Sequence, residues 1–430
     1  MKRVETRYIL KDSELFKTQV LAWSQQYDSV IWLDSNQHHE KYAQYEAILA
    51  VGAHTFLKTD YKNAFEKLKN YQSQTKDYIF GYLGYDLKND IENLQSNNAD
   101  SLDFEDLYFF QPKKLIFISG HTVTFKYLES EKKDLESDFE IICKTENLID
   151  RDNSSKANLK LRISKDTYLE KVHNILQNIH HGDLYEATFC QEFYSENTSI
   201  DPLKVYHNLN EISKPPFATF FKSEHQYLLS ASLERYLKKL GNKIISQPIK
   251  GTAKRSNSKT EDARLKAALK TDPKERAENV MIVDLVRNDL SRISQKGTTE
   301  VEELCGVYSF KQVHQMISTI STQAPEESHP VDIIKNTFPM GSMTGAPKIA
   351  AMEIIEKEEE SKRGLYSGSV GYFSPTGDFD FNVVIRSILY NQKQKYVSFS
   401  VGSAITSLAK PETELEECLL KAKAMRQVLI

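Results

Sequence analysis

The stretch KDTYLEKVHNILQNIHHGD (165–183), followed directly by YEATFCQEFY (185–194), places a helical pattern before a strand pattern. Apolar residues recur three or four positions apart in the first segment, which is typical of a helix with one buried face. Downstream of these segments, helices and strands are predicted to alternate without an internal repeat. The sequence therefore predicts a fold that mixes helices and strands.

The composition is that of a globular protein. The chain has 430 residues, enough for two or three domains at roughly 150 residues each, or for fewer large ones. Lys and Arg number 56 and Asp and Glu 60, a formal charge of −4, so general binding of nucleic acid or anionic lipid is not expected. Hydrophobic content of 40% and few glycines and prolines argue against disorder.

The cysteines and the N-terminus indicate the compartment. No CxxC pair occurs, so we expect reduced, packed thiols at Cys143, Cys190, Cys305 and Cys418. The first 16 residues, MKRVETRYILKDSELF, have no apolar core, and nowhere do eighteen apolar residues run together. We expect a cytoplasmic protein that does not bind membranes.

Regular elements are predicted in the first third of the chain. SVIWLD (29–34) and KKLIFIS (113–119) are short apolar runs typical of strands, whereas YKNAFEKLKNYQ (61–72) is typical of a helix. The two glycines of FGYLGYDL (80–87) lie among aromatic residues, which favours close backbone packing in a sheet over phosphate binding.

A domain boundary is predicted near residue 155. Between residues 129 and 160 the chain is strongly charged and then polar, as expected of a solvated helix followed by a linker. We therefore expect an N-terminal α/β region at 1–155 and a second domain at 156–430.

Several nucleotide and hydrolase motifs are absent from the sequence. There is no Walker A loop and no GxGxxG that opens a helix after a strand. GxSxG and HExxH are also missing, which argues against serine hydrolases and zincins.

Lys250 lies in QPIKGT (247–252), directly after the strand-like KIISQ (243–247), so it is predicted at a strand end. A lysine is a nucleophile only as the free amine, which requires desolvation or a nearby cation. An ordinary surface lysine is the alternative.

Two predicted helices carry carboxylates. ENVMIVDLVRNDLSRI (278–293) has helical spacing with Glu278 in its opening turn, where the helix dipole stabilises an acid. In PETELEECLLKAKAM (411–425), Glu414, Glu417 and Lys421 share one face. These three residues either form a solvated charged face, or the two glutamates bind Mg²⁺ together with a carboxylate of the first helix.

The segment FPMGSMTGAPK (338–348) is predicted to be a loop that feeds a helix N-terminus at GAPKIAAMEIIEK (345–357). The loop either binds a carboxylate through exposed backbone N–H groups or is a tight structural turn.

Arg386 lies within the apolar run FNVVIRSILY (381–390). A charge in a buried strand requires an anionic partner, which is either a structural salt bridge or the carboxylate of a substrate.

Together and in this order, these segments resemble the chorismate-utilising enzymes, most closely the branch of aminodeoxychorismate synthase component I. The resemblance is dense from about residue 165 to the C-terminus, through SASLERY, QPIKGT, RAENVMIVDLVRND, VHQMISTI, GSMTGAPK, YSGSVGYF and VIRSI. It is looser before that, where it rests on GYLGYDL and DLYFFQPKKLIFI. It implies an α+β fold of two closely packed parts with large, mainly antiparallel sheets flanked by helices.

The resemblance also implies roles in binding. Glu278 and Glu417, supported by Glu414, would bind Mg²⁺, and the metal would bind the ring carboxylate of chorismate. Arg386 and Tyr366 would hold the enolpyruvyl carboxylate. The full implied set of substrate-binding residues is Thr252, Thr344, Gly345, Tyr366, Arg386, Gly402 and Lys421.

The implied reaction is amination of chorismate at ring carbon 4. Lys250 would attack ring carbon 2 and expel the 4-hydroxyl, and ammonia would then displace the lysine. Glu234 would be the general acid and later the base, and His314 would lie near the carbon that loses its hydroxyl. Burial and the neighbouring metal would keep Lys250 neutral. The product would be 4-amino-4-deoxychorismate, a precursor of para-aminobenzoate and folate.

Other activities of the family remain as alternatives. Anthranilate synthase component I has alanine at the position of Lys250 and eliminates pyruvate. Isochorismate-forming relatives activate water with a lysine at the position of Glu186, so this chain departs from their pattern. A homologue that binds chorismate without converting it is the third alternative.

A partner protein is also implied. The chain has no glutaminase segment with a glycine-flanked nucleophilic cysteine, and Cys190 in TFCQEF is better explained by strand packing. Ammonia would therefore come from a separate glutamine amidotransferase subunit.

Overall fold

The computed structural model describes residues 2–38, 41–146 and 157–430. The predicted boundary at residue 155 lies outside these ranges. Four thiols are free, of which Cys143 is exposed and Cys190, Cys305 and Cys418 are buried, so the prediction of packed thiols is wrong for Cys143. In the described ranges, no helix has both the length and the apolar content needed to cross a membrane.

Antiparallel strand pairs form two sheet arms that diverge from β5 (Leu107–Ser119). The first half of β5 pairs with β4 and the second half with β6, so both arms include β5. The first arm contains, in spatial order, β1 (Arg3–Ile9), β6 (Thr122–Leu128), β5, β3 (Ala47–Thr59), β2 (Ser29–Asp34), β9 (Phe217–Ser223), β10 (Gln226–Ser232), β19 (Ser387–Asn391), β20 (Tyr396–Thr406) and β8 (Glu186–Ser195), with the short strands β7 (Lys160–Leu161) and β16 (Gly345–Ala346) at its end.

The second arm leaves β5 through β4, which lies on the same edge of β5 as β6, because β3 occupies the opposite edge. It contains β4 (Ile79–Leu83), β17 (Ser369–Phe373), β18 (Phe379–Val383), β11 (Arg235–Leu240), β12 (Lys243–Gln247) and β15 (Val313–Gln323), and β15 also pairs with β13 (Ile249–Lys254) and β14 (Glu300–Ser309). Both arms therefore mix strands from the first and last thirds of the chain.

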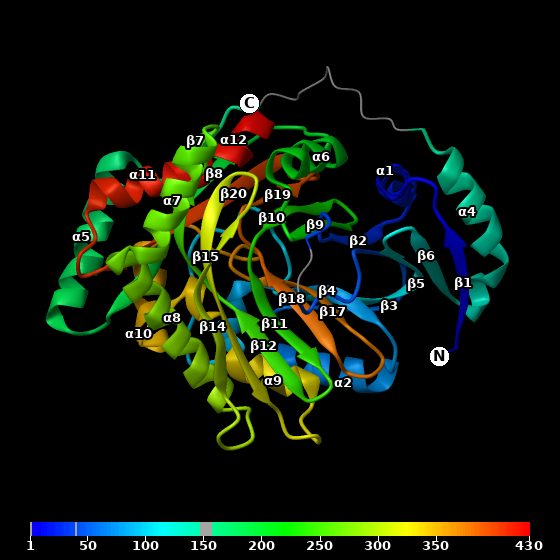
Figure 1. The fold of residues 1–430 in the computed structure, drawn as a ribbon, viewed down its shortest axis with the longest axis horizontal. Coiled ribbons are helices and arrows are strands. Elements are labelled where there is room, and N and C mark those ends of the chain that lie inside the picture. Colours follow the sequence, from blue (N-terminus) through cyan, green and yellow to red (C-terminus); the bar gives the residue numbers. More distant parts are fainter. Residues whose placement is uncertain (1, 39–40, 147–156) are drawn as a thin grey trace.

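Helices cover the outside of the arms. Figure 1 shows α5, α10 and α11 at one side of the molecule and α1 and α4 at the opposite side. The α-helices are α1 (Ser13–Trp23), α2 (Ala64–Thr75), α3 (Lys88–Ile91), α4 (Leu135–Lys144), α5 (Lys165–His181), α6 (Pro202–Ser213), α7 (Lys259–Thr271), α8 (Pro273–Ser291), α9 (Pro330–Thr337), α10 (Lys348–Glu358), α11 (Pro411–Lys421) and α12 (Lys423–Leu429). Short 3₁₀ turns lie at η1 (Ser24–Gln26), η2 (Tyr85–Leu87), η3 (Glu129–Asp134) and η4 (Gly341–Met343).

Two hydrophobic cores lie on opposite faces of the first arm. Along β2, Val30 and Trp32 belong to one core and Ile31 to the other, because successive side chains of a strand point to opposite faces. Strands buried on both faces read as continuous apolar runs, which explains SVIWLD. The predicted α+β class with mainly antiparallel sheets is confirmed.

The helix and the strand predicted from residues 165–194 are both present. Helix α5 starts after Ser164, whose side chain accepts a hydrogen bond from the Thr167 N–H, and ends at Gly182 in the left-handed conformation. Strand β8 follows and is buried along almost its whole length. The glycine prediction also holds, because a Cβ on Gly81 would lie 2.0 Å from the Tyr108 carbonyl oxygen of β5.

Helix α8 begins earlier than predicted. It starts at Pro273 after the N-cap Asp272, so Glu278 lies in its second turn and not in its opening turn. Stabilisation of Glu278 by the helix terminus is therefore a weak explanation for this acid, since that effect fades after the first turn.

Candidate functional site

A cavity of about 190 Å³ lies between the ends of the two sheet arms. Strands β8 and β20 contribute one wall, β13 and β15 another, and helices α8 and α11 supply charged side chains. The structure brings together most of the predicted residues, which line this cavity as Glu234, Lys250, Thr252, Glu278, Tyr366, Arg386, Gly402, Glu414, Glu417 and Lys421.

His314 does not line the cavity, contrary to expectation. Its ring is 1% exposed and hydrogen-bonds Asp262 at 3.0 Å and Ser309 at 2.9 Å. The neighbours Val313 and Gln315 line the cavity, so alternation along β15 turns His314 to the other face. Gln315 faces the cavity, and its side-chain amide donates to the Gly251 carbonyl oxygen at 2.8 Å.

Thr344 and Gly345 also lie outside the cavity lining. The Thr344 hydroxyl donates to the carbonyl oxygens of Met340 and Gly341, and Gly345 pairs with Ala187 of β8. The loop reaches the cavity instead through Ser342 and Met343. Of the two alternatives for this loop, Thr344 and Gly345 therefore fit the tight structural turn.

Lys250 forms a buried ion pair with Glu186. Its Nζ lies 2.7 Å from Glu186 Oε1, and Glu186 is completely buried at the start of β8. Helix α8 fixes the lysine backbone, because the Asn279 side-chain amide donates to the Lys250 carbonyl oxygen at 3.0 Å. The lysine is therefore held at one place on the cavity wall.

The groups around Lys250 favour its protonated form. Burial works against the charged form, but Glu186, Glu278 and Glu417 outweigh it and raise the lysine's pKa. The expectation of a neutral amine included a neighbouring metal ion and stays a prediction; the protein groups around Lys250 alone favour the ammonium form.

Glu234 is a buried acid beside this lysine. Burial raises its pKa to about 7, although Ser342 and Lys250 act in the opposite direction. The Ser342 hydroxyl donates to Glu234 Oε1 at 2.5 Å. A carboxyl group that titrates near pH 7 is suited to proton transfer at that pH.

Helices α8 and α11 bring four carboxylates to one side of the cavity, namely Glu275, Glu278, Glu414 and Glu417. Burial raises the pKa of Glu278 to about 7 and also raises that of Glu414. The Oε1 atoms of both are buried without a hydrogen-bond partner in the described residues. Carboxylate oxygens that come from two helices and lack hydrogen bonds fit a hard divalent cation such as Mg²⁺.

These carboxylates do not converge into a formed metal site. Nowhere in residues 2–38, 41–146 and 157–430 do three His, Cys, Asp or Glu side chains meet closely enough to hold an ion as they stand. The Lys274 ammonium lies among them, 3.7 Å from Glu278 Oε1 and 3.5 Å from Glu414 Oε1. Burial disfavours its charge, but the four carboxylates outweigh burial and raise the pKa of Lys274.

Arg386 lies at a break between two strands and not within one. Strand β18 ends at Val383 and β19 starts at Ser387, and Arg386 has a left-handed φ of 51°. Within the described chain, no side chain forms an ion pair or hydrogen bond with its guanidinium, which lines the cavity. A half-buried guanidinium that faces a cavity without such a partner favours an anionic ligand over a structural salt bridge.

Lys421 of α11 and Gly402 of β20 lie next to each other in the cavity lining. Lys421 Nζ lies 2.6 Å from Glu417 Oε1 and donates to the Gly402 carbonyl oxygen at 2.8 Å. A Cβ on Gly402 would lie 2.4 Å from Cys190 Sγ, so a side chain has no room there. Tyr366 is buried beside them, with its hydroxyl 3.8 Å from Cys190 Sγ.

The cavity residues that the sequence prediction missed include Lys274, Glu275, Gln315 and Ser342. The first two lie one helical turn before Glu278, so an earlier helix start would have placed them on the same side. Gln315 and Ser342 carry no comparable signal, because strand facing and loop shape fix their positions.

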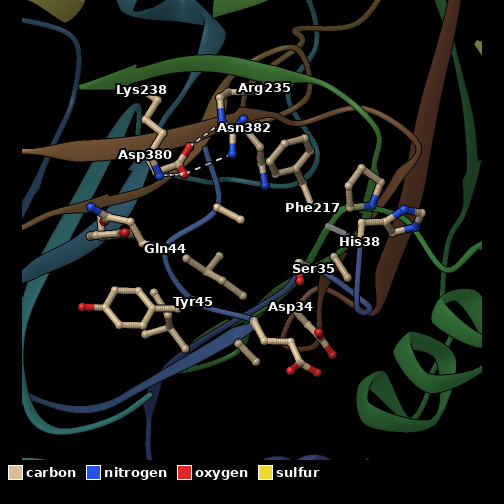
Figure 2. A pocket seen from close by; sticks show the side chains of 18 of the residues that line it. Asp34, Ser35, His38, Gln44, Tyr45, Phe217, Arg235, Lys238, Asp380 and Asn382 are labelled. Carbon is tan, nitrogen blue, oxygen red and sulfur yellow. Dashed lines mark hydrogen bonds and ion pairs between the residues drawn. The ribbon is translucent and has the colours of Figure 1, made fainter. Parts of the chain in front are cut away.

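A second cavity, of about 80 Å³, lies against β2, β9 and β11. Figure 2 shows the Asp380 carboxylate between the side chains of Arg235 and Lys238 at its wall. Lys238 Nζ lies 2.6 Å from Asp380, and Arg235 lies 2.9 Å from it. The charged groups at this wall are therefore paired with each other.

Comparison with known proteins gives consistent matches. Residues 18–427 match the family described as chorismate binding enzyme. A probable chloroplastic aminodeoxychorismate synthase of Oryza sativa subsp. japonica is 41% identical over 278 residues, which cover 64% of this chain but 31% of the relative. The chain thus spans about a third of that relative's length.

Shorter relatives are covered more fully. Aminodeoxychorismate synthase component 1 of Escherichia coli is 31% identical, over 81% of this chain and 76% of the relative. Anthranilate synthase component 1 of Thermus thermophilus is 32% identical with the same coverage, so overall identity does not separate the two activities. The crystal structure of anthranilate synthase component I from Streptococcus pneumoniae superimposes with a TM-score of 0.79 at 24% identity, over 91% of this chain and 94% of that one.

Proposed function

The chain belongs to the family of chorismate binding enzymes, and on that basis we propose that it aminates chorismate at ring carbon 4 to give 4-amino-4-deoxychorismate. The observation that carries the proposal is the pair of Lys250 and Glu234 in one cavity. An amine and an acid that titrates near pH 7 are the two groups that a covalent substitution of a hydroxyl requires.

Binding of a dicarboxylate is supported by two features. The unpaired guanidinium of Arg386 suits the enolpyruvyl carboxylate of chorismate. Glu278, Glu414 and Glu417 would hold Mg²⁺, which would supply positive charge for the ring carboxylate. We propose a metal here because the Oε1 atoms of Glu278 and Glu414 are buried without a hydrogen-bond partner in the described residues.

The covalent step requires Lys250 as a free amine. Glu186, in contact with Lys250 at 2.7 Å, is the nearest base and accepts its proton. The lysine nitrogen then forms a bond to ring carbon 2, the two ring double bonds shift toward carbon 4, and the bond between carbon 4 and its hydroxyl breaks; attack by ammonia at carbon 4 later shifts them back. Glu234 donates its proton to the leaving hydroxyl, which departs as water.

Ammonia completes the substitution. It bonds to carbon 4 as the bond between carbon 2 and Lys250 breaks, and the Glu234 carboxylate takes a proton from the new ammonium group. The net reaction converts chorismate and ammonia into the product and water. We propose that a separate glutamine amidotransferase subunit supplies the ammonia, because the E. coli and other relatives named component 1 imply a partner component.

The test is product identification by chromatography with mass detection after incubation with chorismate, Mg²⁺ and an ammonium salt. The proposal predicts 4-amino-4-deoxychorismate, with pyruvate retained. Anthranilate or isochorismate would contradict the role of Lys250 within the same family. Bound chorismate with no product, even with a glutaminase partner, would favour a non-catalytic homologue.

A further inference from the structure

The ammonium of Lys274 lies between the two helices that carry the cavity carboxylates. We propose that Lys274 is a resident counter-cation that occupies the place of the divalent ion and must be displaced before that ion binds, so that this lysine sets the metal affinity. The inference rests on the metal site of the proposed function and adds the residue that competes for it.

The geometry places Lys274 between the two helices. It lies in the first turn of α8, one turn before Glu278, and its Nζ also reaches Glu414 of α11. Its N–H donates to the Asp272 side chain at 2.9 Å, which fixes the backbone. The side chain is 40% exposed, so it has a path into solvent when the ammonium leaves.

The contacts of Lys274 neutralise the carboxylates without satisfying them. Its Nζ lies 3.5 and 3.7 Å from the two Oε1 atoms, whereas charge-assisted hydrogen bonds of this type span about 2.7–2.9 Å. Both oxygens are buried and lack a hydrogen bond within the described chain, and Glu414 is 2% exposed. A divalent ion coordinated at about 2.1 Å would satisfy them.

The other two lysines of the cavity are held more tightly. Lys421 contacts Glu417 at 2.6 Å and the Gly402 carbonyl oxygen at 2.8 Å, and Lys250 contacts Glu186 at 2.7 Å. Lys274 is therefore the cation that an incoming ion displaces with the least loss of contacts.

The experiment measures Mn²⁺ binding to the full chain by the electron paramagnetic resonance signal of the free ion, without chorismate. Lys274→Met removes the charge and keeps most of the aliphatic stem. We expect it to lower the dissociation constant at least about fivefold, because the wild type must first break the contacts of the ammonium. Lys274→Gln, a second neutral variant, should behave in the same way, and Lys274→Arg should stay near the wild type.

Lys270→Met is the matched control, since Lys270 is an exposed lysine at the end of α7. It should leave the dissociation constant unchanged. A second measurement is thermal unfolding without metal: Lys274→Met should unfold at a lower temperature than the wild type, and Mn²⁺ should raise that temperature by more than in the wild type.

The outcomes separate the two proposals. Equal or weaker Mn²⁺ binding by both neutral variants, with clear binding by the wild type, would overturn the role of Lys274 and leave the metal site standing. If neither the wild type nor any variant binds Mn²⁺, with or without chorismate, the metal assignment itself is wrong and this inference falls with it.

Discussion

The two cavities of this protein contain similar charged groups, but these groups are paired more completely in the second cavity than in the cavity of Lys250. At the wall of the second cavity, Arg235 and Lys238 share the Asp380 carboxylate. In the cavity of Lys250, Arg386 has no partner in the described chain and buried carboxylate oxygens of Glu278 and Glu414 lack hydrogen bonds. Because unpaired buried charges are costly, a fold keeps them where a charged ligand compensates them. The comparison predicts that substitutions in the first set lower stability and that substitutions in the second set weaken ligand binding.

The largest effect is expected at Lys250. Lys250→Ala removes the proposed nucleophile and should lower 4-amination at least about a thousandfold, as the loss of a covalent catalytic group does. Chorismate affinity should change little, because Arg386 and the carboxylates remain. Product formation and chorismate binding by calorimetry measure both. Lys254→Ala, at the exposed end of β13, is the control; undiminished amination by Lys250→Ala would rule out the covalent route.

A smaller loss is expected at the acidic cluster. Glu278→Gln removes a charged oxygen and should weaken Mg²⁺ dependence and activity together, by at least about tenfold, the lower range for disturbed metal sites. A Mg²⁺ titration of the rate measures this change. Glu412→Gln, an exposed acid in the first turn of α11, should leave the titration unaltered. High activity with an unchanged Mg²⁺ requirement would remove Glu278 from the metal site.

The unpaired guanidinium provides the next test. Arg386→Gln removes a charge-assisted contact worth about 1.5–3 kcal/mol, so KM for chorismate should rise about 10- to 100-fold. Steady-state kinetics at saturating Mg²⁺ separate KM from kcat. Because no protein partner of the guanidinium is lost, thermal stability should be maintained. An unchanged KM together with reduced stability would make Arg386 a structural residue after all.

The smallest effect on activity is expected in the second cavity. Lys238→Met breaks a paired charge and should lower the free energy of unfolding by about 1.5–3 kcal/mol. Urea unfolding and the amination rate should therefore separate, with stability reduced and kcat unchanged. A loss of kcat comparable to that of Arg386→Gln would erase the distinction between the two cavities.

The sequence predicted what local patterns encode. Helix α5 and strand β8 follow from apolar periodicity, and the packing of Gly81 follows from its aromatic neighbours. The start of α8 was placed five residues late, because its first turn is polar and carries no apolar signal. Lys274 therefore lay outside the predicted helix.

The site was predicted by residue type better than by side-chain direction. Lys250, Glu278 and Glu417 lie in one cavity, as the resemblance implied. His314 and Gln315 are neighbours on a strand, and only the pairing with β13 decides which of them faces the cavity. The break at Arg386 was invisible for a similar reason, since an apolar run does not reveal where its pairing stops.

The pairing of β4 with β17 has a consequence for synthesis of the chain. Strand β4 (Ile79–Leu83) finds one of its two neighbours about 290 residues later, in β17. At ribosomal rates of about 5–20 residues per second, that edge of β4 waits roughly 15–60 s for its partner. The waiting edge is apolar and open to pairing with other chains. Until the far end of the chain has left the ribosome, this edge of β4 therefore lacks the partner that covers it in the folded protein.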